Sequence, residues 1–191
     1  AGATSFKAYM HVSRAVLGAA IDEVHKRGLR ITGHLCSVTL AEAAAMGIDN
    51  IEHGFFAATD FVENKQPDVC PGQGAGQQAL ASITPQDPRF TALVRTLVER
   101  NVALTSTLAV FETFTPGRPL PPGLEVLTPQ LRELFEQRHA ATARNVRSNY
   151  ATLYPRAAAL ELAFFRAGGL LVAGTDPTGG GGVVAGFSNQ R

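Results

Sequence analysis

Short apolar runs with a period of two alternate along this chain with longer segments whose apolar residues recur every three or four positions. The first pattern is typical of β-strands and the second of amphipathic α-helices. We expect strands near residues 5–9, 29–34, 48–53, 102–108 and 170–174. We expect helices near 13–27, 39–47, 88–100 and 128–166. Strands that alternate with helices predict a parallel sheet, which is either covered on both faces or closed into a barrel.

Local signals place several of these helix ends. Thr39 precedes an Ala-rich segment with Glu42 three residues further on, which is the pattern of a capping box. Gly47 is a suitable stop for that helix. Thr128 is placed to cap the last helical region, which we expect to break near Pro155.

Two segments lack either periodicity. Residues 54–88 are rich in Gly, Pro, Gln and Asp, and residues 112–127 carry four prolines. The GQGAG run in the first segment has no preceding strand and no Gly-Lys-Ser ending, so it is not a phosphate-binding loop. We interpret it as a flexible lid or a surface loop, because long loops in compact domains are often functional.

The charge pattern restricts the partners of the chain. Its 191 residues carry a formal net charge of +1, and no run of Lys or Arg stands out. This pattern favours neither nucleic acid nor an anionic membrane as a partner. No apolar stretch is long enough to span a bilayer. Cys36 and Cys70 form neither a CxxC pair nor a disulfide framework, so we expect two free thiols, with a single bridge as the alternative.

Chemically capable side chains fall at the carboxyl ends of four of the five predicted strands. They are Lys7, His34, His53 and Asp176. Parallel strands place these ends at one edge of the sheet, which is where (β/α)8 barrels hold their active sites. Neutral imidazole and carboxylate are ligands for zinc and similar divalent metals. The alternatives are unrelated histidines in loops, a solvated Lys7 and a turn-forming Asp176. For His11, His25 and His139 we favour structural roles.

Four motifs with this spacing resemble the amidohydrolase superfamily, in particular its imidazolonepropionase-like and Xaa-Pro-dipeptidase-like branch. They are FKAY around Lys7, ITGHLCS around His34, NIEHG around His53 and AGTDPTG around Asp176. The resemblance implies a hydrolase that cleaves a C–N bond of a small amide, cyclic amide or dipeptide. It implies one or two divalent metal ions, with zinc preferred, bound by His34, His53, Asp176 and Lys7. In such enzymes a lysine at the Lys7 position is N-carboxylated, and the aspartate at the Asp176 position handles the proton.

The resemblance covers about the last five strands of such a barrel. The chain has no His-x-His motif, which these enzymes carry on their first strand. We therefore expect residues 1–191 to be a single, truncated domain: an incomplete TIM-type (β/α)8 barrel, inactive when isolated. Its expected partners are the missing N-terminal half of the barrel or further copies of itself. Two rival interpretations are a doubly wound α/β binding domain without metal and a noncatalytic half-barrel that pairs with another chain.

Overall fold

A five-stranded parallel sheet forms the centre of the protein. The computed structural model describes residues 2–176, without the side chain of Gln73. The strands are β1 (Ser5–Ala8), β2 (Arg30–Gly33), β3 (Asn50–Glu52), β4 (Ala103–Ser106) and β5 (Leu171–Ala173). They lie side by side in the order β1-β2-β3-β4-β5, and every neighbouring pair is parallel. The predicted α/β class with a parallel sheet is confirmed.

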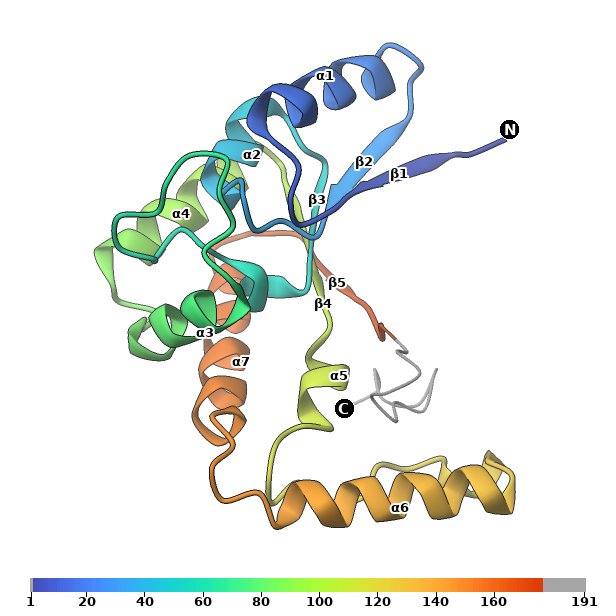
Figure 1. Cartoon of the computed structure of the whole chain (residues 1–191). Coiled ribbons are helices and arrows are strands. Elements are labelled where there is room, and N and C mark those ends of the chain that lie inside the picture. The colour runs from blue at the N-terminus through green and yellow to red at the C-terminus, as the bar shows by residue number, and fades with distance from the viewer. Residues whose placement is uncertain (1, 177–191) are drawn as a thin grey trace.

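Helices connect successive strands. They are α1 (Arg14–His25), α2 (Leu40–Met46), α3 (Gln73–Ser82), α4 (Pro88–Glu99), α5 (Leu108–Glu112), α6 (Pro129–Ala143) and α7 (Tyr150–Arg166). Two short 3-10 turns, η1 (Gly54–Ala57) and η2 (Leu124–Val126), complete the described elements. Figure 1 shows α1, α2, α4 and α7 on one side of the strands, whereas α6 lies apart from the sheet.

The strand order decides how the sheet is wound. Each crossover leads to the adjacent strand in the same direction, and crossovers of one hand place their helices on one face. A doubly wound sheet instead reverses its strand order and carries helices on both faces. The described strands contain no such reversal, so this part of the sheet is singly wound, which favours the barrel over the doubly wound alternative. Closure of the strands into a barrel stays a prediction.

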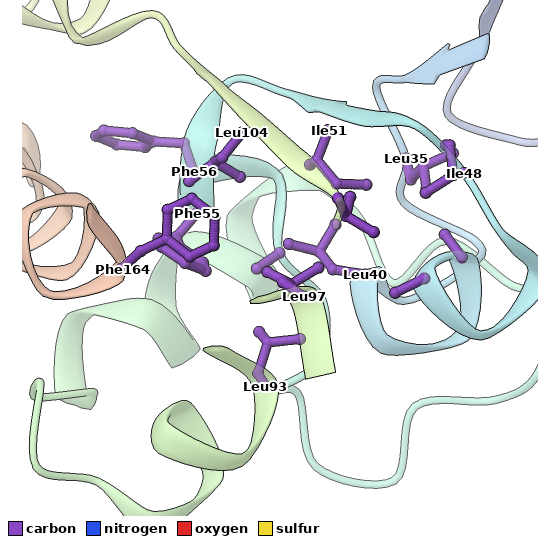
Figure 2. Packing of buried hydrophobic residues seen from close by; sticks show 14 of the residues in the cluster. Leu35, Leu40, Ile48, Ile51, Phe55, Phe56, Leu93, Leu97, Leu104 and Phe164 are labelled. Carbon is purple, nitrogen blue, oxygen red and sulfur yellow. The ribbon is translucent and has the colours of Figure 1, made fainter. Parts of the chain in front are cut away.

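The face of the sheet that meets the helices is apolar. Ile51 of β3 pairs with Leu104 of β4 and with Gly33 of β2, and Ile31 lies two positions before Gly33, on the same face. All three apolar side chains are buried. They join one core cluster with apolar side chains from α1, α2, α4 and α7, part of which Figure 2 shows. Phe55 of η1 lies in this cluster edge-to-face with Phe90. The core therefore anchors η1, which follows His53 directly, against the outer helices.

The opposite face of the sheet is polar. Thr32 donates a hydrogen bond to Glu52 Oε1 (2.8 Å) and accepts one from Asn50 Nδ2 (2.7 Å). Thr105 donates to Asn50 Oδ1 (3.0 Å). These side chains are half-buried, and they serve as hydrogen-bond partners for one another across β2, β3 and β4. The polar ladder shows that this face is built for contact with water or polar groups rather than for an apolar core.

Several helix ends follow the predicted signals. Thr39 accepts a hydrogen bond from the Glu42 backbone N–H while the Glu42 side chain accepts from the Thr39 N–H, so the capping box is confirmed. Gly47 ends α2 with a left-handed φ of 94°. Thr128 caps α6 through the Leu131 N–H. These interactions are local in sequence, which is why sequence patterns could predict them.

The Gly-rich segment differs from its prediction. Its GQGAGQQ residues begin a regular helix, α3, rather than a flexible loop. Leu80 within α3 and Ile83 at its end are fully buried. Their burial offsets the entropy cost of the glycines, each about 1 kcal/mol relative to alanine. Tertiary packing thus overrides a low intrinsic helix propensity.

The break in the last helical region also differs from its prediction. The chain leaves helical geometry between Ala143 and Tyr150, and Pro155 lies inside α7. Pro155 sits within two turns of the start of α7, so its missing N–H removes one bond near the helix end. Leu153, Ala157 and Leu160 are buried on both sides of it. This packing keeps α7 continuous through the proline.

Cys36 and Cys70 form a disulfide, so the expectation of free thiols was wrong. Their Cα atoms lie 4.9 Å apart, although 34 positions separate them in sequence. Cys36 follows β2, and Cys70 precedes α3. The sequence placed Cys36 in the turn after a predicted strand and Cys70 in an irregular segment, and it gave no distance between them. The bridge joins the end of the 58–72 segment to the edge of the sheet that carries His34.

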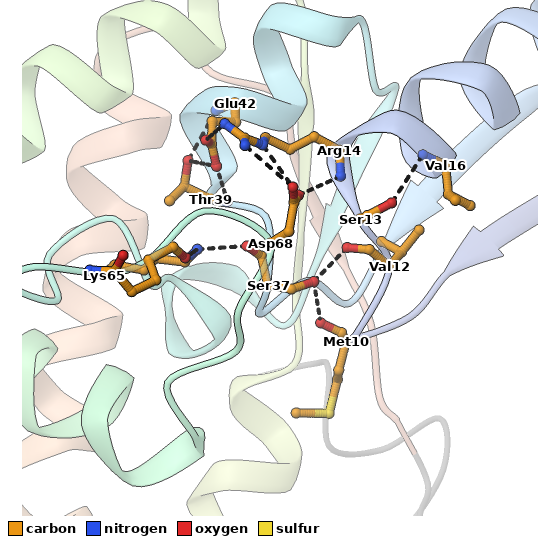
Figure 3. A network of polar contacts seen from close by, with 11 residues as sticks. Met10, Val12, Ser13, Arg14, Val16, Ser37, Thr39, Glu42, Lys65 and Asp68 are labelled. Carbon is orange, nitrogen blue, oxygen red and sulfur yellow. Dashed lines mark hydrogen bonds and ion pairs between the residues drawn. The ribbon is translucent and has the colours of Figure 1, made fainter.

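Polar contacts hold the same segment at a second place (Figure 3). Asp68 accepts hydrogen bonds from the Arg14 backbone N–H (2.7 Å) and guanidinium. Lys65 donates to the Ser37 carbonyl (2.6 Å), and the Ser37 hydroxyl donates to the Met10 carbonyl (2.9 Å). Residues 58–72 are therefore tied to α1 and to the loop after β2, both of which flank the predicted site.

Candidate functional site

His34 and His53 lie next to each other at the carboxyl edge of the sheet. His34 follows β2 and donates its backbone N–H to the Ala8 carbonyl (3.1 Å), which extends the β1–β2 pairing to this position. His53 follows β3 and has a left-handed φ of 66°. The ring centroids are 4.4 Å apart, with an interplanar angle of 68°. Two neighbouring parallel strands thus bring both imidazoles together.

Asp176 joins this pair from the end of β5. Its carboxylate Oδ2 lies 3.6 Å from His53 Nδ1. The same ring nitrogen lies 3.0 Å from the Thr107 hydroxyl, at the end of β4. A His53 tautomer with its proton on Nδ1 donates toward these oxygens and leaves the Nε2 lone pair free. The hydroxyl and the carboxylate therefore orient the ring for a ligand at Nε2.

Lys7 lies at the rim of the same site. It sits on β1 opposite Thr32 and is exposed. Its positive charge contributes to lowering the pKa of both His34 and His53. Tyr9, two residues on, packs edge-on against the His34 ring at a centroid distance of 5.0 Å. All four predicted site residues thus come from strand ends at one edge of the sheet.

Burial favours the neutral form of both imidazoles. Together with the nearby charges of His53 and Lys7, it lowers the pKa of His34 to about 4. Burial also lowers the pKa of His53, although the Asp176 carboxylate opposes this shift. Neutral imidazole is the form that binds a metal. The pair is therefore ready to accept a cation at neutral pH without first losing protons.

A pocket of about 200 Å³ opens beside the two histidines. Its polar end is formed by His34, His53 and Asp176. Its other walls come from η1, α3, α5 and the start of α7, with Phe56, Phe111, Phe114 and Tyr150 among the lining residues. Cys36 also contacts the pocket, so the disulfide is part of its boundary.

Sequence reasoning missed several residues of this region. Thr107 and the aromatic side chains lie in segments that carried no motif. Glu161 on α7 is another: it is 2% exposed, and its Oε1 lies where a side chain on Gly54 would stand. Burial raises the pKa of Glu161 to about 7, and the nearby Ser106 side chain opposes that rise. A glutamate among the apolar residues of α7 was the one available signal.

The other histidines lie outside this cluster. His25 Nε2 is 3.0 Å from the Asp49 carboxylate, and Asp49 also accepts the Ile31 backbone N–H. His139 Nε2 lies 2.8 Å from the Arg118 carbonyl. His11 is exposed in the turn before α1. These contacts link neighbouring elements, in line with the structural roles expected for them.

The donor set for a metal is partial in the described residues. Within residues 2–176, no three His, Cys, Asp or Glu side chains are gathered closely enough to form a complete metal site. His34, His53 and Asp176 provide two neutral nitrogens and one carboxylate oxygen, which is a donor chemistry that suits zinc. The residues present fit a divalent ion as part of its coordination shell.

Comparison with known proteins supports the fold. No protein-family model matches the chain, and no curated protein matches it. The chain is similar to the crystal structure of an uncharacterized protein, with 15% sequence identity and a TM-score of 0.50. The match covers 95% of this chain and 36% of that protein, so the chain spans about a third of its length. None of the helices in residues 2–176 has the length and apolarity needed to cross a membrane.

Fold and site together define a class: an α/β protein with a singly wound parallel sheet and a His-His-Asp cluster at its carboxyl edge. Ligand sites of parallel sheets lie at this edge, outside the carboxyl ends of the strands. The cluster opens into a pocket, and its imidazoles are neutral. The cluster is thus in the place, and in the protonation state, that a ligand site requires.

Proposed function

We propose that this chain belongs to a metal-dependent hydrolase of the amidohydrolase type, which cleaves the C–N bond of an amide, a cyclic amide or a dipeptide. The proposal rests above all on one observation. The neutral rings of His34 and His53 lie 4.4 Å apart, with the Asp176 carboxylate 3.6 Å from His53. Under this proposal the sheet is part of a (β/α)8 barrel and comprises about its last five strands.

His34 and His53 would hold one divalent ion, with zinc preferred, and Asp176 would face the same or a second ion. A metal held there would make hydroxide available as the nucleophile near neutral pH and would polarise the scissile carbonyl. Lys7 in its ammonium form would oppose metal binding. Carboxylation on Nζ would turn that repulsion into attraction, since it replaces the positive charge with a negative one and adds two oxygen ligands.

Asp176 is the group in this site placed to move a proton. Its side chain is 38% exposed and thus reaches the open side of the pocket. A carboxylate there can take a proton from an attacking water and return it to the leaving nitrogen. The Thr107 hydroxyl holds the neighbouring His53 imidazole in place during this transfer. The pocket walls orient the rest of the substrate.

The proposed enzyme needs further strands besides those of the described sheet. His34, His53 and Asp176 are too few donors for a complete two-metal site, and both edge strands of the described sheet are unpaired on one side. A further barrel segment or a second copy of the chain would complete the sheet and the donor set. We accordingly expect the 191-residue chain to bind metal weakly and to hydrolyse no substrate without its complement.

Zinc titration of the purified chain, followed by calorimetry, tests the proposal. We expect His34→Asn and His53→Asn each to weaken zinc binding about tenfold or more, since either change removes one of a few ligands. His139→Asn, far from the cluster on α6, is the matched control and should bind zinc as the wild type does. Equal affinity in all four proteins would contradict the proposal.

A noncatalytic half-barrel module is the second candidate function. The edge strands favour it, because Phe6 on β1 is 42% exposed and Leu170 next to β5 is 63% exposed. Exposed apolar side chains beside unpaired strand edges drive association. Size-exclusion chromatography with and without zinc distinguishes the hydrolase from the noncatalytic module. Association that is the same with and without zinc, and the same in both histidine variants, would favour the module.

A further inference from the structure

Aromatic rings form one wall of the pocket beside the histidines. Phe56 and Phe111 stack with centroids 3.8 Å apart and an interplanar angle of 23°. Tyr150 lies 6.1 Å from Phe56 and 6.2 Å from Phe111, close to parallel with both. Phe114 adds a fourth ring, 5.6 Å from Tyr150. Three segments far apart in sequence thus present a continuous aromatic surface next to the polar cluster.

Another part of the pocket boundary is formed by α3, which a glycine allows to pack closely. Gly76 on α3 lines the pocket, and a Cβ at this position would meet the Ala58 carbonyl at 3.2 Å. The absence of a side chain lets α3 approach the segment after η1. Gln77, the next residue, reaches the Tyr150 hydroxyl at 3.4 Å and accepts from Asn149 Nδ2 at 3.3 Å. These contacts link α3 to the start of α7, which carries part of the aromatic wall.

The size and charge of the pocket restrict what it can hold. Its volume is about 200 Å³, whereas an apolar cavity of about 150 Å³ already binds benzene. Pockets for whole drug-sized ligands measure about 300–1,000 Å³. No Lys or Arg is among its described lining residues, and its one carboxylate, Asp176, lies at the polar end. The pocket therefore suits one uncharged group of the size of a phenyl ring.

We propose that this aromatic pocket is the specificity site of the protein, and that it binds an uncharged phenyl-sized group of the substrate. The inference rests on the proposed function, because the polar end of the pocket is the cluster that would act on the scissile bond. The substrate class is then an amide or dipeptide with an aryl group two or three bonds from the scissile carbonyl carbon. Stacking with Phe111 and Tyr150 favours aromatic over aliphatic groups of equal size.

Binding of small amides in the presence of EDTA tests this inference apart from the metal. The probes are 3-phenylpropanamide, 3-cyclohexylpropanamide and 3-(4-guanidinophenyl)propanamide, and the readout is ligand-observed NMR titration. We expect 3-phenylpropanamide to bind at least about tenfold more tightly than the other two probes. Phe111→Leu should weaken its binding about tenfold, whereas Phe165→Leu, on the exposed side of α7, should leave it unchanged.

A second variant is needed in case Phe111→Leu fails to fold. Phe114 is 36% exposed at the pocket rim, so Phe114→Ala should keep the fold and still weaken the phenyl probe several-fold. Equal affinity for the three probes, or unchanged binding in both Phe111→Leu and Phe114→Ala, would overturn the inference. That result would leave the zinc titration of the histidine variants unaffected. Equal zinc affinity in the wild type and the histidine variants, with intact phenyl binding, would instead overturn the proposed function alone.

Discussion

The His34 ring lies edge-to-face with the His53 ring, at a centroid distance of 4.4 Å. The register explains this contact, because Gly33 of β2 pairs with Ile51 of β3 and both strands end within two residues of that point. The left-handed backbone of His53 then turns its ring toward the polar end of the pocket rather than into the core. Two neutral nitrogens are thereby placed side by side, which is the basis of the proposed metal site.

Removing the charge of Lys7 should raise the pKa of both histidines. Burial is the largest cause of the low pKa of His34, followed by the charges of His53 and Lys7. Lys7→Gln should therefore move the titration of His34 to higher pH, and NMR of the imidazole resonances measures this directly. Lys26→Gln at the exposed end of α1 is the control. If the titration midpoint of His34 were the same in Lys7→Gln as in the wild type, the charge of Lys7 would not act on the site.

Loss of the disulfide should destabilise the protein markedly. The bridge between Cys36 and Cys70 closes a loop of 34 positions, for which chain entropy gives roughly 3–4 kcal/mol. The double variant Cys36→Ala/Cys70→Ala should lose about that much free energy of unfolding in urea. Dithiothreitol should destabilise the wild type to a similar extent and have no effect on the double variant. A wild type insensitive to reductant would show that the bridge contributes nothing.

Glu161 should make the protein less stable at higher pH. Its folded-state pKa of about 7 lies above the usual value of 4.5, so the folded protein binds more protons between these two values. Stability should accordingly fall as pH rises through this range, by at most about 3 kcal/mol. Glu161→Gln should remove this loss and be the more stable protein at pH 8.

Urea unfolding at pH 5 and pH 8 measures the effect of Glu161. Glu99→Gln, an exposed glutamate at the end of α4, is the matched control and should retain the wild-type pH dependence. If Glu161→Gln were to keep the full pH dependence, another group would be responsible for it.

A side chain at Gly54 should be poorly tolerated. A Cβ there would lie 1.9 Å from Glu161 Oε1, and the backbone has a φ of +58°. Gly54→Ala should therefore suffer both backbone strain and a clash against a buried carboxyl, and should cost several kcal/mol. Gly28→Ala has a similar φ of +66° but meets nothing within 4 Å, so it should cost only about 1 kcal/mol. Thermal unfolding of the two variants should show this difference, and equal losses would contradict it.

Local patterns in the sequence predicted much of the fold. The capping box of Thr39 and Glu42, the stop at Gly47 and the alternation of strands and helices all depend on neighbouring residues. The shared edge of His34 and His53 followed from one rule, the common direction of parallel strands. Such features need no knowledge of distant contacts, and the structure shows all of them.

Features that depend on distant contacts were not predictable in this way. The Gly-rich start of α3 is helical because Leu80 packs into a core that the local sequence does not reveal. The disulfide joins two segments whose separation in space was unknown. The aromatic wall combines Phe56, Phe111 and Tyr150 from three elements, and none of the three carries a motif. Each of these depends on the tertiary arrangement, which a single sequence does not specify by pattern alone.

Anomalous diffraction at the zinc edge, from crystals grown with zinc, shows directly whether His34 and His53 share a metal ion. We expect an anomalous peak between the two rings, about 2.0–2.1 Å from one nitrogen of His34 and one of His53. Asp176 should lie in or beside the same coordination shell. Zinc found elsewhere, such as at His25 and Asp49, with no peak between His34 and His53, would contradict it.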